Sequence, residues 1–215
     1  MTVVETIWLL LQLCRQGNLS NYPLLETLTP PFVRRSTNAS LRKLSRAIES
    51  IGARRHRQAF ENVSRVVIFV GHGRSGHSLI GSLLDAHEHA IVAHELDALG
   101  AVEEGVSEKQ LFFQLLARSR WFKRRGAKWS GYRYAVPSQY KGEFTSLKVI
   151  GDKKGGESTK HLRRNPDLLR RLWQVVGRPI HVLHVKRHPL DNISTLARKD
   201  HDGDLDAAID HYFRD

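Results

Sequence analysis

The chain has 215 residues and a mass of 24.5 kDa, which is enough for one α/β domain with a sizeable core but too little for two full-sized domains. Hydrophobic residues make up 40% and charged residues 26%, and no apolar run reaches the ~18 residues that a membrane-spanning helix needs. The single cysteine, Cys14, excludes an intrachain disulfide and a cysteine-based zinc site.

The chain is strongly basic. Lys and Arg total 34 against 22 acidic residues, giving a formal net charge of +12 and a pI of about 10.2, and most of the cations are arginine. The planar guanidinium group suits bidentate contacts with phosphate, sulfate and carboxylate. This composition fits either a solvated basic surface or an anionic ligand such as a nucleotide, a nucleic acid or an acidic polymer, and it does not choose between them.

In chain order, residues 1–60 are expected to form a helical N-terminal arm. Residues 3–15 are an apolar, helix-like stretch, and a loop-like region follows up to Pro31. The apolar positions between residues 40 and 60 recur at helical spacing. The start of the chain lacks the basic region and the cleavage site of a signal peptide. We therefore expect a soluble, cytoplasmic protein, although Asn-x-Ser sequons such as the one at Asn62 would also fit the lumen of the Golgi.

Residues 61–215 are expected to form the main domain, in which strands alternate with helices. Short β-branched runs typical of buried parallel strands occupy residues 66–70, 90–93, 147–151 and 180–185. Helical patterns occupy residues 79–84, 108–122 and 165–176 and continue from residue 190. This alternation predicts a three-layer, P-loop-like α/β fold with a mostly parallel central sheet.

The first candidate site is the glycine-rich turn Gly-His-Gly-Arg-Ser-Gly at residues 71–76, between the first predicted strand and its helix. Such a turn exposes backbone N–H groups, and the helix N-terminus adds roughly half a positive charge, so the loop suits phosphate or sulfate. The spacing is close to a Walker A motif, but His77 stands where the lysine is required. The turn is also close to the nucleophile elbow G-x-S-x-G, in which His77 replaces the last glycine.

The second candidate site follows the fourth predicted strand. Arg187 ends that strand, and Ser194 and Thr195 lie in the first turns of the next helix. An arginine and a hydroxyl group placed in this way form a phosphate clamp. The alternative for Arg187 alone is a solvated surface arginine.

These motifs together make the sequence recognisable. Residues 71–78, with Leu-Leu-Asp-Ala-His at 83–87, resemble the 5′-phosphosulfate loop of sulfotransferases that use 3′-phosphoadenosine 5′-phosphosulfate (PAPS), most closely the protein-tyrosine and Golgi carbohydrate branch. The resemblance implies that Arg187, with Ser194 or Thr195, binds the 3′-phosphate, and that Arg74 replaces the catalytic lysine of the cytosolic enzymes. It also implies that the amides of four loop residues hold the 5′-phosphosulfate: Ser75, Gly76, His77 and Ser78.

The resemblance also implies two further catalytic residues. Glu95 matches the general base of the tyrosine sulfotransferases, and the reaction needs a carboxylate because the acceptor loses a proton as it attacks sulfur. Lys153 matches a lysine aimed at the transferring sulfonate, where a cation offsets the charge on the bridging oxygen. Lys154 is the alternative by one register, and Glu95 has the alternative role of pairing with a nearby arginine.

No metal ion is expected at this site. His87, His89 and His94 lie close together in the sequence, but the region has no cysteine and is rich in arginine. In the family that the chain resembles, the reaction requires no metal. We therefore expect PAPS as cosubstrate and no metal cofactor.

The sequence thus predicts a PAPS-dependent sulfotransferase acting on a hydroxyl or amine of a protein tyrosine, a carbohydrate or a small molecule. The resemblance covers about residues 63–200, so the domain is expected to lack the family's C-terminal, adenine-binding part. Two other functions stay open: a P-loop kinase or NTPase, and a basic polyanion-binding protein without enzymatic activity. Nucleic acid is not an expected partner.

Overall fold

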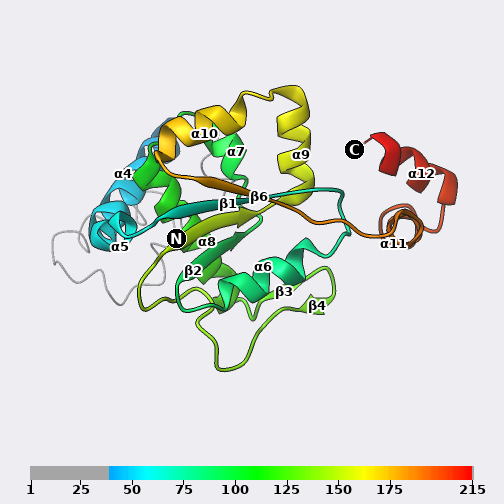
Figure 1. Ribbon diagram of the computed structural model, residues 1–215, viewed down its shortest axis with the longest axis horizontal. Helices are drawn as coiled ribbons and strands as arrows, with labels where there is room; N and C mark the ends of the chain where they lie inside the picture. The colour runs from blue at the N-terminus through cyan, green and yellow to red at the C-terminus, as the bar shows by residue number, and fades with distance from the viewer. Residues whose placement is uncertain (1–38, 215) are drawn as a thin grey trace.

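The computed structural model describes residues 39–214, and this part of the chain is an α/β structure (Figure 1). Its four main strands form a parallel sheet in the order β2–β5–β1–β6. Their bounds are β1 (Arg65–Val70), β2 (Ala90–His94), β5 (Val149–Lys153) and β6 (Ile180–His184). The predicted α/β class and parallel sheet are therefore confirmed.

All four predicted strands are present. Three of them differ from the prediction by a single residue at one end, and β5 is shifted by two residues. β5 runs over Val149–Lys153 rather than residues 147–151. Leu147 is fully buried in the core before the strand begins, while pairing with β2 continues as far as Lys153, which lies opposite His94. The shift matters because it makes Lys153 the last strand residue instead of a loop residue.

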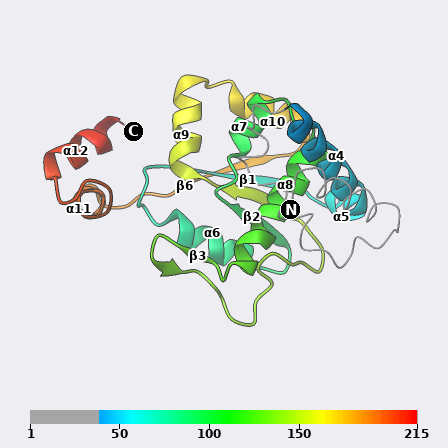
Figure 2. The same cartoon turned by 180° about the vertical axis from the view of Figure 1, so that it is seen from behind.

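Helices flank the sheet on both faces, as the two opposite views show (Figures 1 and 2). On one face, Val66 and Ile68 of β1 join a large apolar core with α7 (Ala98–Glu103), α8 (Glu108–Arg124) and α10 (Leu168–Val176). The other face belongs to α6 (His77–Asp85), where Val67 and Phe69 form a smaller cluster with partly buried Leu84. This division follows from the alternation of side chains along β1.

The described part of the predicted helical arm consists of α4 (Ala39–Arg55) and α5 (Arg57–Glu61). Ala53 and Phe60 belong to the large core, and a Cβ added at Gly52 would lie 2.1 Å from the ring of Phe113 on α8. The glycine therefore lets α4 approach α8 closely. The apolar stretch at residues 3–15 lies outside the described residues.

Several elements were not predicted. They are the short helix α7, the hairpin of β3 (Lys128–Trp129) and β4 (Tyr132–Arg133), the helix α9 (Gly155–Arg164), and α12 (Leu205–Arg214). α12 packs against α11 (Pro189–Asp200), and both lie beyond the carboxyl end of the sheet (Figure 2). Within residues 39–214, no helix combines the length and the apolar character needed to cross a membrane.

Candidate active site

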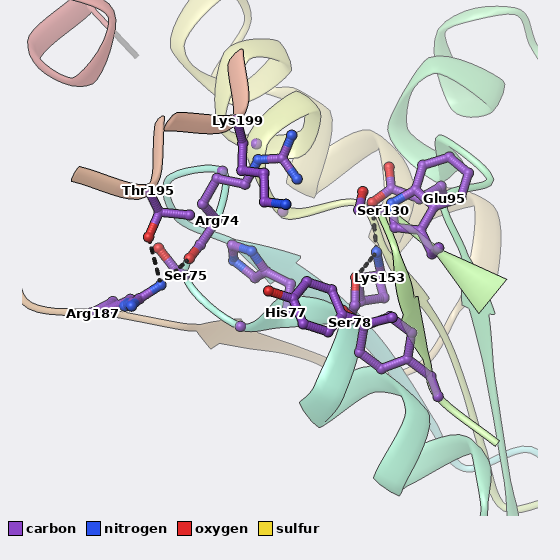
Figure 3. A pocket seen from close by; sticks show the side chains of 17 residues that line it. Arg74, Ser75, His77, Ser78, Glu95, Ser130, Lys153, Arg187, Thr195 and Lys199 are labelled. Atoms are coloured by element: carbon purple, nitrogen blue, oxygen red, sulfur yellow. Dashed lines mark hydrogen bonds and ion pairs between the residues drawn. The ribbon is translucent and has the colours of Figure 1, made fainter. Parts of the chain in front are cut away.

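The carboxyl ends of the four parallel strands meet at one edge of the sheet, where a pocket of about 560 Å³ opens (Figure 3). The loop 71–76 follows β1, and Glu95 follows β2. Lys153 ends β5, and Arg187 follows β6. Residues 73–76 of the loop line the pocket together with Glu95, Lys153 and Arg187, at the edge where ligands bind in open parallel α/β sheets.

The loop after β1 has a backbone that requires glycine at two positions. Gly71 has φ 130° and Gly76 has φ 99°, in the left-handed region that other residues rarely adopt. A Cβ at Gly71 would also lie 2.5 Å from the carbonyl oxygen of Val185. The N–H of Gly71 donates to Thr159 Oγ1 of α9 at 2.8 Å, which ties the loop to that helix. The first residues of α6, His77 and Ser78, lie in the pocket wall. The N–H groups of a first helical turn have no partner within the helix, so they suit an anion.

His77 occupies the place of the Walker A lysine, but its ring is fixed within the fold. Its Nε2 lies 3.1 Å from the carbonyl oxygen of Val70, and a Cβ at Gly155 would lie 2.4 Å from the same nitrogen. Burial lowers the pKa of His77, so the neutral ring donates its Nε2–H to Val70. The backbone of His77 begins α6 at the pocket wall, while its side chain anchors this turn to β1 and α9.

Lys153 and Glu95 form an ion pair inside the pocket. The Lys153 ammonium donates to Glu95 Oε1 at 2.5 Å and to Ser78 Oγ at 2.9 Å (Figure 3). The Lys153 side chain is 3% exposed, and burial lowers its pKa, against the opposing effect of the Glu95 charge. The structure thus brings Glu95, Lys153 and Ser78 together, and it places Lys153 in the pocket, whereas Lys154 lies at the start of α9 outside the pocket lining.

A buried carboxylate that the sequence analysis missed holds the Glu95 loop in place. Asp152 accepts hydrogen bonds from the backbone N–H groups of Leu96, Asp97 and Ala98 at 3.0, 2.8 and 2.8 Å. Burial raises the pKa of Asp152 to about 6. Glu95 itself has φ 60°, so its conformation depends on these neighbours. The available sequence signal was an aspartate directly after the predicted strand of residues 147–151.

Arg187 and Thr195, the pair that the sequence predicts to bind a phosphate, lie together at the other end of the pocket. Arg187 Nη1 donates to Thr195 Oγ1 at 3.3 Å and to the carbonyl oxygen of Arg74 at 3.3 Å. Thr195 lines the pocket, whereas Ser194 is exposed and lies outside its lining. Lys199, one helical turn beyond Thr195, also lines the pocket and was missed, although a spacing of four residues puts both on one face of α11.

Two loop residues contact α11 directly. Arg74 forms a bidentate ion pair with Asp200 at the end of α11, with Nε donating to Oδ2 at 2.9 Å. The Ser75 hydroxyl accepts a hydrogen bond from Asn192 Nδ2 at 2.9 Å. Asn192 is 1% exposed, so its sequon is inaccessible to glycosylation in this fold. The loop is therefore held from three sides, by β1, α9 and α11.

Aromatic side chains from the β3–β4 hairpin line the pocket near Glu95. Trp129 and Tyr132 are 40% and 60% exposed, and Tyr134 hydrogen-bonds Ser78. Figure 3 shows Glu95 and Ser130 at one end of the pocket and Arg187 with Thr195 at the other. The pocket therefore has Arg187 and Thr195 at one end and the Glu95–Lys153 pair at the other, with aromatic side chains in its lining.

The side chains of His87, His89 and His94, which were considered for a metal site, do not meet at one point. His94 packs its ring against Phe122 and Trp129, with centroids 3.8 and 5.0 Å apart, and burial lowers its pKa to about 2. His87 and His89 contact each other, with ring centroids 5.5 Å apart. In the described part of the chain, no group of three or more His, Cys, Asp or Glu side chains is arranged to hold a metal ion.

Comparison of the chain with models of protein families, with curated proteins and with solved structures finds no match. The chemistry of the pocket must therefore be argued from its own geometry. That geometry offers backbone N–H groups and cations for an anion at one end, and a lysine–carboxylate pair beside aromatic walls at the other.

Proposed function

We propose that the protein is a PAPS-dependent sulfotransferase. The observation that carries this proposal is that two groups suited to anions line one pocket: the start of α6 with the loop after β1, and the Arg187–Thr195 pair after β6. A donor with phosphate on both the 3′ and the 5′ oxygen of one ribose needs two such sites a short distance apart. The volume of about 560 Å³ lies in the range of small-ligand pockets.

The residues present fit the donor. A Cβ built on Gly73 or Gly76 would meet nothing within 4 Å, so the space above the loop is open to a phosphosulfate. The amides from Ser75 to Ser78 would hold that group. Arg187, Thr195 and Lys199 would hold the 3′-phosphate.

The pairing of Glu95 with Lys153 inside the pocket supports sulfonate transfer. The donor would supply the sulfonate, whose bond to the phosphate oxygen breaks as the acceptor oxygen or nitrogen bonds to sulfur, leaving 3′,5′-ADP. Glu95 would accept the acceptor's proton, and Lys153, held 2.5 Å away, would offset negative charge on the bridging oxygen. The aromatic end near Glu95 is where a hydroxyl or amine acceptor would enter.

The position of His77 argues against phosphoryl transfer from ATP by a P-loop mechanism. That mechanism needs a flexible lysine that reaches the β- and γ-phosphates. Here the ring is fixed against Val70 and the start of α9, as its 3.1 Å contact with the Val70 oxygen shows. The kinase alternative therefore has less support than sulfonate transfer.

The test is transfer of labelled sulfonate from PAPS to a panel of tyrosyl peptides, carbohydrates, small alcohols and amines. The wild-type protein should label at least one class, and Glu95→Gln, which keeps the shape of the side chain, should lose that activity. Glu88→Gln is the matched control, since Glu88 precedes β2 and lies outside the pocket lining. Transfer of phosphate from ATP without any sulfonate transfer would contradict the proposal.

A further inference from the structure

Arg74 is the only arginine or lysine in the loop 71–76. Its guanidinium group already binds a carboxylate of the same chain. Nε donates to Asp200 Oδ2 at 2.9 Å, and Nη2 donates to Oδ1. A planar fork that binds a carboxylate in this way presents the same two N–H groups that a phosphate or sulfonate would take. The carboxylate of Asp200 thus has the geometry of an anionic ligand at the loop.

Asp200 stands in an unfavourable place for a carboxylate unless it has this partner. It is the last residue of α11, where the exposed carbonyl groups give the helix end a partial negative charge. The hydrogen bond from Arg74 lowers the pKa of Asp200, so the pair is ionised at neutral pH. The contact with Arg74 therefore opposes the unfavourable effect of the helix end on the Asp200 carboxylate.

The pair is suited to exchange because it is only partly buried. The Arg74 and Asp200 side chains are 30% and 27% exposed, so breaking their contact leaves each charge in reach of water. The loop would also keep its other ties to this part of the chain: Asn192 donates to Ser75, and the rings of His72 and Tyr212 stack 4.2 Å apart. Release of Arg74 therefore does not detach α11 and α12 from the loop.

We propose that Asp200 is an internal competitor for the anionic ligand, holding Arg74 until a phosphosulfate or diphosphate group displaces it. Ligand binding would then replace the Arg74–Asp200 pair by an Arg74–ligand contact and leave Asp200 to solvent. This inference rests on the proposed function only in requiring that the pocket takes an anion. It predicts that Asp200 sets the affinity of the site without touching the ligand.

The test measures binding of inorganic pyrophosphate and of 3′,5′-ADP by calorimetry at constant ionic strength. Asp200→Asn should bind both about 2- to 5-fold more tightly, the usual worth of a partly exposed ion pair. Asp191→Asn is the matched control, since it removes the same charge from the first turn of the same helix. The two variants are compared with pyrophosphate, because Asp191 lies in the turn of α11 that carries Thr195, near the proposed 3′-phosphate site. With pyrophosphate the gain from Asp191→Asn should be clearly smaller, because Arg74 pairs with Asp200 and not with Asp191.

A double-mutant cycle identifies the partner. Adding Asp200→Asn to Arg74→Ala should give no gain in affinity, because the fork for which the two anions compete is gone. Weaker or unchanged binding by Asp200→Asn, an equal gain from Asp191→Asn, or a gain that persists without Arg74 would each overturn the inference. The measurement with pyrophosphate separates this inference from the proposed function. If the protein did not prefer a nucleotide with a 3′-phosphate, PAPS would not be its donor. Competition between Asp200 and an anion for Arg74 could still be measured with pyrophosphate.

Discussion

Replacing Arg187 by alanine should weaken the binding of a 3′-phosphorylated nucleotide and spare its 5′-phosphorylated counterpart. Arg187 touches Thr195 Oγ1 and the carbonyl oxygen of Arg74, both at 3.3 Å, and lies at the end of the pocket away from Glu95. A charge-assisted contact contributes ~1.5–3 kcal/mol, so the affinity for 3′,5′-ADP should fall by roughly 10- to 150-fold. Because Arg187 is exposed, the fold should survive the change.

Calorimetric titration of 3′,5′-ADP and 5′-AMP into both proteins is the assay, at one ionic strength since salt screens such contacts. Arg198→Ala is the control, because Arg198 is an exposed arginine of α11 that lies outside the pocket lining. It should change the two affinities little and by the same factor. If Arg187→Ala weakened both nucleotides equally, the residue would not contact the 3′-phosphate, and the two-site argument would fail.

Three further outcomes are expected. Glu95→Gln should reduce turnover by ~10²–10⁴-fold and leave the affinity for 3′,5′-ADP nearly unchanged, and full activity in a sulfonate-transfer assay would exclude Glu95 as the base. Thr195→Ala should lower the affinity for 3′,5′-ADP by roughly 2- to 10-fold, whereas the neighbouring Ser194→Ala should leave it unchanged. Titration of the nucleotide into the two variants tests this difference. Asp152 has its pKa raised to about 6 by burial, so its carboxyl group favours folding at low pH and loses that contribution as the pH rises. The stability of wild type relative to Asp152→Asn should therefore fall between about pH 4 and pH 6 in denaturant titrations, and a difference that grows over this range would show that the carboxylate form is the favoured one.

Local patterns sufficed to predict the parts of the fold that depend on neighbouring residues. The β-branched run before Gly71 and the apolar spacing after Gly76 predict β1, the loop and α6, because strand, turn and helix are each encoded within a few residues. The Arg187–Thr195 contact is local as well. α11 begins at Pro189, and the rotation of the helix directs the Thr195 side chain toward Arg187, only eight residues before it in the chain.

The same reasoning could not choose between Ser194 and Thr195, because adjacent residues on a helix point about 100° apart and the phase of α11 was not known. The structure exposes Ser194 and turns Thr195 into the pocket. Similarly, the register of β5 decided that Lys153, and not Lys154, lies at the site.

Contacts between residues far apart in the chain could not be predicted from local sequence patterns. The Arg74–Asp200 pair joins residues far apart in the chain, and nothing near either residue indicates it. α9 was missed because its first residues, Gly155 and Gly156, are poor helix formers. Glycine at position 155 makes room for the His77 ring, a contact that only the folded structure shows. These contacts depend on how the sheet brings its strand ends together.

The most direct test of a PAPS site is a thermal-shift comparison of 3′,5′-ADP, 5′-AMP and ATP at equal concentrations. At about a hundred times its Kd, a nucleotide that binds the folded protein alone contributes ~2.7 kcal/mol of stability. We expect 3′,5′-ADP to give the largest increase in Tm, because it alone engages both the loop after β1 and the Arg187–Thr195 clamp. An equal shift with 5′-AMP, or a larger one with ATP, would contradict the proposed donor.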